Sequence, residues 1–127
     1  MVIKVDNEKE KIEALVDVVQ LSLPKVVWLS EPERRFFVET VLLKWEGVDI
    51  SKKKGVDATR QRMGWVKESR QPYKFRTDLK SKGWMRKKRG KWVLPETFVK
   101  NPGNNIKVQV EIKMENNDRG ADSESGE

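Results

Sequence analysis

Positively charged side chains are the residues best suited to do chemistry in this chain, and they are concentrated between residues 51 and 100. That stretch carries 17 basic and four acidic side chains, a net charge of +13, whereas residues 1–50 and 101–127 each have a net charge of −3. A localised positive patch of this kind is the electrostatic footprint of a protein that binds a polyanion.

Groups suited to catalysis or to metal binding are scarce. The chain has no histidine and no cysteine, so the commonest general base, the commonest metal ligand and thiol nucleophiles are all missing. Asp49 and Asp57 flank a lysine run, and we interpret them as solubilising or capping groups. Tyr73 is the only tyrosine and lies among cations that favour its phenolate. A tyrosine nucleophile would need further groups around a phosphate, so we expect no enzyme, no cofactor and no metal.

The densest part of the basic patch predicts a short helix over about 70–82, a glycine break and a β-hairpin over about 84–94. Ser69 is placed to cap the helix, Pro72 falls in its first turn, and Gly83 ends it. Two runs led by tryptophan follow, joined by a short loop that contains Gly90. That pattern is typical of a hairpin.

The two faces of this helix differ in chemistry. At about 100° per residue, Pro72, Phe75 and Leu79 share one face, which we expect to pack on a core. The opposite face has no aliphatic side chain and consists of Arg70, Tyr73, Lys74, Thr77, Lys80 and Ser81. Side chains of these types reach phosphates and base edges in a major groove.

The stretch from about Ser30 to Pro95 resembles a winged helix-turn-helix domain, with SRQPYKFRTDLKSKGW as the recognition helix and the basic hairpin as the wing. The resemblance covers about half of the chain and rests on the pattern of elements and charges. It implies an α+β fold with a three-helix core, in which the helix enters the major groove of duplex DNA and the wing reaches phosphates or the neighbouring minor groove. The alternative is a solvated cationic helix and hairpin without a nucleic-acid partner.

Three groups of side chains are the candidate DNA contacts under this resemblance. They are Lys52, Lys53, Lys54, Arg60 and Arg62 before the helix, Arg70, Gln71, Tyr73, Lys74, Thr77, Lys80 and Ser81 on it, and Arg86, Lys87, Lys88, Arg89 and Lys91 in the wing. Lysines position by charge, whereas arginines also pair with guanine through two hydrogen bonds. Arg70 and Lys74 are the best base-reading candidates, with Gln71 and Thr77 beside them. For any single residue, phosphate contact or solvation is the commoner role.

Three further helices are predicted before residue 64. An apolar stripe with i, i+3, i+4, i+7 spacing predicts a helix over 8–21. Ser30 and Glu33 form a capping box at the start of a second helix, which runs to about residue 45. It is apolar around most of its circumference, so we expect it to be the central core helix. A third helix is predicted over 51–63, with an interruption at Gly55 that leaves 52–54 as a basic loop or ragged first turn.

Four short β-strands are predicted outside the hairpin. Residues 1–5, 25–29 and 48–50 are short apolar runs. Residues 106–114 alternate apolar and polar side chains at every position. A half-buried strand of this kind needs a partner. The candidates for 106–114 are residues 1–5 and a second copy of the protein, because an unpaired edge promotes association.

The sequence therefore divides into an N-terminal strand and helix extension (1–24), a winged helix-turn-helix domain (25–99), a C-terminal strand extension (100–114) and a disordered acidic tail (115–127). The function that we expect is duplex DNA binding in the cytoplasm or nucleoid, as a small transcription regulator or a nucleoid or packaging accessory. The start of the chain does not read as a signal peptide, and no apolar run is long enough for a transmembrane helix. The alternatives are RNA binding and an adaptor subunit, for example of a virion, that associates through 106–114 as a homodimer or with another protein.

Overall fold

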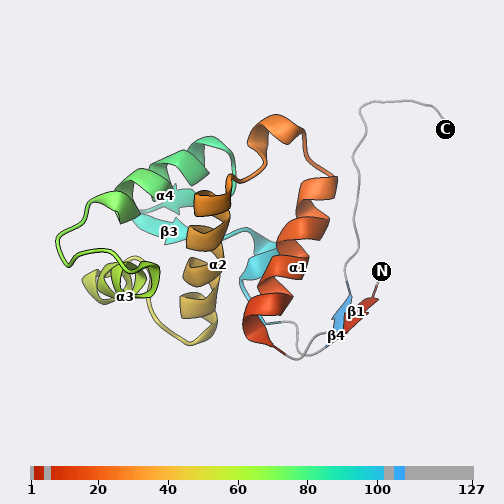
Figure 1. The fold of residues 1–127 in the computed structure, drawn as a ribbon, viewed down its shortest axis with the longest axis horizontal. Coiled ribbons are helices and arrows are strands. Elements are labelled where there is room, and N and C mark those ends of the chain that lie inside the picture. Colours follow the sequence, from red (N-terminus) through yellow and green to blue (C-terminus); the bar gives the residue numbers. More distant parts are fainter. Residues whose placement is uncertain (1, 5–6, 102–104, 108–127) are drawn as a thin grey trace.

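The computed structural model describes residues 2–4, 7–101 and 105–107, and these residues form a mostly helical fold with small antiparallel sheets (Figure 1). The helices are α1 (Glu8–Leu21), α2 (Glu31–Trp45), α3 (Lys53–Met63) and α4 (Gln71–Ser81). The strands are β1 (Val2–Lys4), β2 (Arg86–Lys88), β3 (Lys91–Val93) and β4 (Asn105–Lys107), and short 3-10 turns lie at Lys25–Val27 and Glu96–Phe98. The α+β class is confirmed at this coarse level.

Helix α2 is the centre of the molecule, as its apolar composition predicted. It lies between α1 and the group formed by α3, α4 and the β2–β3 hairpin (Figure 1). Two of its aromatic side chains, Phe36 and Phe37, are fully buried. Phe37 meets the rings of Trp84 and Phe98 edge to face, at centroid distances of 5.3 and 4.9 Å, and Phe36 stacks on Phe75 at 5.3 Å. One core therefore joins the helices to the hairpin and to the segment that follows it.

The ends of α2 and α4 show how the sequence sets the helix boundaries. The capping box of α2 is present: Ser30 N–H donates to Glu33 Oε1 (2.8 Å), and Glu33 N–H donates to Ser30 Oγ (3.4 Å). At α4 the cap position is Arg70 and not Ser69, because the carbonyl oxygen of Arg70 accepts the first hydrogen bonds of the helix, from the N–H groups of Tyr73 and Lys74. The Ser69 hydroxyl still accepts from the first helical N–H, that of Gln71, at 3.2 Å.

Two of the predicted strands are wrong. Residues 25–29 contain the 3-10 turn, in which the N–H groups of Val27 and Trp28 donate to the carbonyl oxygens of Pro24 and Lys25. Asp49 and Ile50 begin a turn that Lys52 N–H closes on Asp49 O at 3.2 Å. Ile50 is buried in the core and Leu29 and Val48 pack against it, whereas Val26 is exposed. A strand also needs a neighbouring strand to pair with, which the composition of a run does not reveal.

Helix α3 passes through Gly55 without the predicted interruption, so Lys53 and Lys54 are helical and only Lys52 precedes the helix. The glycine is needed for close packing. A Cβ atom at this position would lie 2.5 Å from Asp49 O and 2.6 Å from Ile50 Cα, which are backbone atoms that cannot easily move. Gly55 therefore lets the first turn of α3 pack directly on the turn that precedes it.

The β2–β3 hairpin is confirmed, with a two-residue turn at Arg89 and Gly90. Both residues have positive φ values, 53° and 78°, which suit the right-handed twist of a two-residue hairpin. The register pairs Lys87 with Trp92 and Lys88 with Lys91.

The second sheet bears on the strand predicted over 106–114. Strand β4 covers the first two residues of that prediction and pairs antiparallel with β1, so that Ile3 lies opposite Ile106. Residues 1–5 were one of the two partners predicted for this strand. Residues 108–114 of the predicted strand and the acidic tail at 115–127 lie outside the described residues.

Candidate functional site

Helix α4 presents the two faces that its sequence predicts. Pro72 and Leu79 are buried, and Phe75 packs partly buried against the core. All six residues assigned to the outer face are exposed: Arg70, Tyr73, Lys74, Thr77, Lys80 and Ser81. Gln71 is exposed as well. The helix therefore carries a mixed basic, hydroxyl and aromatic surface on the side that faces away from α2.

The cations of α4 and of the hairpin have no carboxylate partner within the described chain. None of Arg70, Lys74, Lys80, Arg86, Lys87, Lys88, Arg89 and Lys91 forms an ion pair there, and all eight are exposed. In contrast, Lys53, Arg60 and Arg62 of α3 are all paired. The positive charge of α4 and the hairpin is therefore available to an external anion.

The hairpin also places like charges directly opposite each other. Lys88 faces Lys91 across the two strands, next to the turn residue Arg89. Opposed like charges on neighbouring strands destabilise a hairpin by a few tenths of a kcal/mol up to about 1 kcal/mol. A bound polyanion would remove this repulsion, because it supplies the negative charge that the described neighbours lack.

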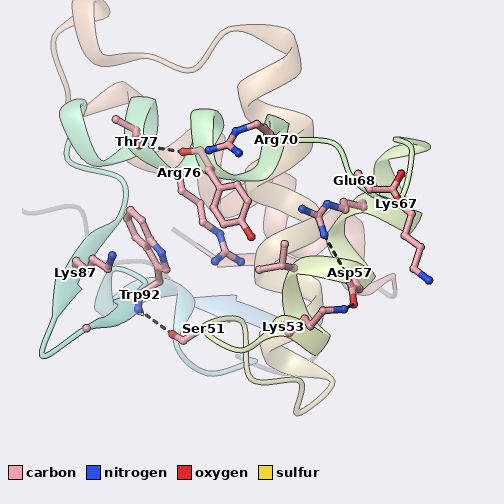
Figure 2. A pocket seen from close by; sticks show the side chains of 14 residues that line it. Ser51, Lys53, Asp57, Lys67, Glu68, Arg70, Arg76, Thr77, Lys87 and Trp92 are labelled. Carbon is pink, nitrogen blue, oxygen red and sulfur yellow. Dashed lines mark hydrogen bonds and ion pairs between the residues drawn. The ribbon is translucent and has the colours of Figure 1, made fainter.

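A hollow of about 890 Å³ lies between α3, α4 and the hairpin. Its lining combines six cationic side chains, Lys53, Arg60, Lys67, Arg70, Arg76 and Lys87, with two carboxylates, Asp57 and Glu68. Figure 2 shows Trp92 and Lys87 on one side of the hollow and Asp57 and Lys53 on the other, with Arg76 between them. The hollow thus draws on all three groups of candidate residues and has an excess of positive charge.

One wall of the hollow is held by an ion-pair network on α3. Asp57 accepts from Lys53 Nζ at 3.0 Å and from Arg60 Nη1 at 2.9 Å. The hydrogen bond from Lys53 and that from Arg60 hold the pKa of Asp57 below its usual value. Arg60 also donates through Nε to Ser69 O at 2.9 Å, and its guanidinium lies over the ring of Tyr73. Arg60 therefore fixes the start of α4 against α3.

Some of the candidate residues are not part of this arrangement. Arg62 is directed at α2, where it pairs with Glu39 and Glu46. Lys52 and Lys54 are exposed at the start of α3 but do not line the hollow. The hydroxyl groups of Thr77 and Ser81 donate to the carbonyl oxygens one turn earlier in α4, at 3.0 and 3.2 Å, so their protons are already engaged.

The structure adds residues that sequence reasoning missed. Arg76 is on the inner side of α4 with 2% exposure, and the ring of Trp92 lies within 5.9 Å of its Cζ atom. Lys67 lines the hollow from the turn before α4, and Ser51 Oγ accepts from the N–H of Trp92 at 2.9 Å. The helical period does place Arg76 beside the core-facing arc, and this was the available signal for its burial.

Comparisons with known protein families, with curated protein sequences and with solved structures gave no match. Among the described residues, no three acidic side chains gather into a group that could hold a metal ion. No helix in the same part of the chain combines the length and the apolar character needed to cross a membrane.

Proposed function

We propose that this protein binds duplex DNA without catalysing a reaction, as a winged helix-turn-helix domain in which α4 is the recognition helix and the β2–β3 hairpin is the wing. The order α2, α3, α4, β2, β3 supports this proposal, because it is the order of elements in that architecture. The role would be that of a small regulator or a nucleoid or packaging accessory.

The observation that carries the proposal is the set of eight exposed cations on α4, its N-cap and the hairpin that form no ion pair with a described residue. Phosphate contacts by lysine and arginine supply most of the affinity of non-specific DNA binding. Arg70 is the N-cap of α4 and Lys74 lies one turn further on, near the helix N-terminus, where side chains of a recognition helix reach base edges. Arginine at such a position pairs with guanine through two hydrogen bonds.

The test is a titration of duplex DNA, single-stranded DNA and RNA of matched length at several salt concentrations. If α4 and the hairpin neutralise about five to seven phosphates, the logarithm of the affinity for the duplex falls with the logarithm of salt at a slope of roughly −4 to −6. Duplexes of scrambled sequence serve as the control for sequence preference.

Two outcomes would contradict the proposal. Tighter binding of RNA than of duplex DNA at every salt concentration would make this an RNA-binding surface. The absence of binding to all three nucleic acids at low salt would instead favour an adaptor that meets an acidic protein.

A further inference from the structure

Arg76 is a buried positive charge without a counter-ion among the described residues. Its Nη2 atom donates to Ile50 O at 2.7 Å, while its Nε atom is buried and has no hydrogen-bond partner. No described carboxylate forms an ion pair with it. Burial lowers the pKa of Arg76 to about 10, so the side chain is still charged at neutral pH. A buried charge without a partner is costly to a folded protein, which indicates that a compensating group is supplied from outside.

The surroundings of Arg76 define what that group can be. Its guanidinium lines the hollow, and only one of its nitrogen atoms donates a hydrogen bond to the described chain. Cations from three elements line the same hollow: Lys53 and Arg60 on α3, Arg70 on α4 and Lys87 on the hairpin. Asp57 is already neutralised by Lys53 and Arg60, which leaves Glu68 as the one carboxylate of the lining that forms no ion pair with a described residue.

We propose that the hollow between α3, α4 and the hairpin binds a phosphate group, with Arg76 as its fixed counter-charge. Phosphate fits because it carries several acceptor oxygens and one to two negative charges, which match a planar guanidinium fork and several neighbouring cations. The phosphate belongs either to a nucleic-acid backbone or to a free phosphorylated small molecule. If the phosphate belongs to a nucleic-acid backbone, the inference rests on the proposed function. If it belongs to a free small molecule, the inference is independent of that function.

The first experiment contains no nucleic acid, so it is independent of DNA binding. Thermal unfolding of the full chain is measured over a range of inorganic phosphate concentrations, with chloride at equal ionic strength as the reference. At a phosphate concentration ten times the dissociation constant, ligand linkage raises the melting temperature by roughly 4–8 °C. The absence of any rise beyond that in chloride would overturn the proposal.

Two matched variants locate the effect. Arg76→Met removes the buried charge, and Arg35→Met removes a charge of the same type from an exposed position of α2 that does not line the hollow. We expect Arg76→Met to lose the response to phosphate and to melt, without phosphate, no lower than the native chain, because the charge that it removes has no ion pair among the described residues. Arg35→Met should keep the response. A full phosphate response in Arg76→Met would overturn the proposal.

A second measurement tests phosphate binding at Arg76 if the Arg76→Met variant does not fold. The Nε–H of a buried arginine exchanges slowly with water, so its ¹⁵N signal can be followed in the native chain and assigned through Arg76→Lys. A saturable shift of this signal with phosphate and none with chloride supports the site. An unchanged signal at saturating phosphate contradicts it.

The source of the phosphate is settled in a third experiment, with duplex DNA at constant ionic strength. If a backbone phosphate occupies the hollow, inorganic phosphate competes with the duplex more strongly than chloride does, and Arg76→Met flattens the salt slope by about one unit. If phosphate binds equally well to the free and the DNA-bound protein, the occupant is a separate phosphorylated molecule. Phosphate binding without DNA binding would reject the proposed function and keep this site.

Discussion

Tyr73 and Phe75 lie two residues apart on α4 and have opposite surroundings. The ring of Phe75 stacks on Phe36 and Trp65, with centroid distances of 5.3 and 5.4 Å, whereas Tyr73 is 49% exposed beside Arg60. A substitution at each position therefore separates the stability of the helix from its function.

We predict that Phe75→Ala lowers the free energy of unfolding by about 2–4 kcal/mol, near the lower part of the range for phenylalanine because the ring is only partly buried. Tyr73→Ala should change stability by less than about 1 kcal/mol and weaken DNA binding, since it removes a contact on the outer face. Chemical denaturation and binding titrations of the two variants provide the measurement. Equal loss of stability in both would show that Tyr73 is part of the core.

The difference between Tyr73 and Arg76 shows what the sequence can predict at the scale of single residues. The exposure of Tyr73 and the burial of Leu79 follow from the helical period. The same period places Arg76 beside the buried arc, but it does not predict that the carbonyl of Ile50 and the ring of Trp92 reach this side chain from distant parts of the chain. The partners of a buried cation depend on the tertiary fold, which no local pattern encodes.

Among the elements, the hairpin concentrates charge at an exposed end. Lys87, Lys88 and Arg89 are all exposed, and none is paired with a described carboxylate. We predict that replacing all three with alanine weakens binding to every DNA sequence about equally and flattens the salt slope by around two to three units. Binding isotherms at four salt concentrations measure both effects.

The matched control for the hairpin variant removes two lysines and one arginine from other parts of the protein. Arg35, Lys44 and Lys100 are exposed and lie outside α4 and the hairpin, so their replacement with alanine should leave the slope nearly unchanged. A similar loss of slope in both triple variants would mean that net charge, and not the hairpin, drives binding.

The end of α4 is joined to the start of α2 by one ion pair. Lys82 Nζ lies 2.6 Å from Glu33 Oε1 and also donates to Trp28 O at 3.0 Å. Burial alone would raise the pKa of Glu33, but hydrogen bonds from Lys82 and Ser30 outweigh it, and the pKa lies below its usual value. The charged carboxylate is thus favoured by folding, so its stabilisation is present above the pKa of the unfolded chain and is lost as pH falls through the folded pKa.

We predict that Glu33→Gln lowers the free energy of unfolding by about 1–3 kcal/mol at pH 7, because Lys82 keeps only a weaker partner. The difference from the native chain should shrink at acidic pH, as the pH falls through the lowered pKa of Glu33 and the native carboxyl also becomes protonated. Denaturation curves from pH 3 to 7 provide the test, with Glu31→Gln in the same first turn as the exposed control. A difference that is constant over this range would contradict the role of the charge.

Element boundaries were predictable where they depend on local chemistry. The capping box at Ser30, the glycine after α4 and the two-residue turn of the hairpin are local features, and the elements that they bound are present. Residues 25–29 and 48–50 were misassigned because a short apolar run fits a strand and a turn equally well. The continuity of α3 through Gly55 depended on a close approach to Asp49 that only the packed molecule shows.

At the scale of the whole molecule, α1 shares its core with the helices that follow it. Ile12, Leu15 and Val16 are buried in the same cluster as Phe36 and Phe37. Complete burial of a side chain of this size contributes about 1.5–3 kcal/mol, so the three together contribute a large part of the stability of a small protein.

We therefore predict that a shortened chain that begins at Pro24 shows no cooperative unfolding transition, whereas one that begins at Asn7 retains it. Circular dichroism during heating distinguishes the two. An unchanged melting temperature in the shorter chain would instead make residues 25–99 an independent domain, as the sequence-based division has it.

The contact of Phe37 with Trp84 and Phe98 has a consequence for synthesis in a living cell. The rings that cover Phe37 come much later in the chain, so α1 and α2 are made before their core can close. At a translation rate of roughly 5–20 residues per second, Phe37 waits on the order of 3–12 s for Phe98 to be added. During that interval the face of α2 that carries Phe37 is not covered by these rings, and a chaperone that holds emerging chains would find its binding site there.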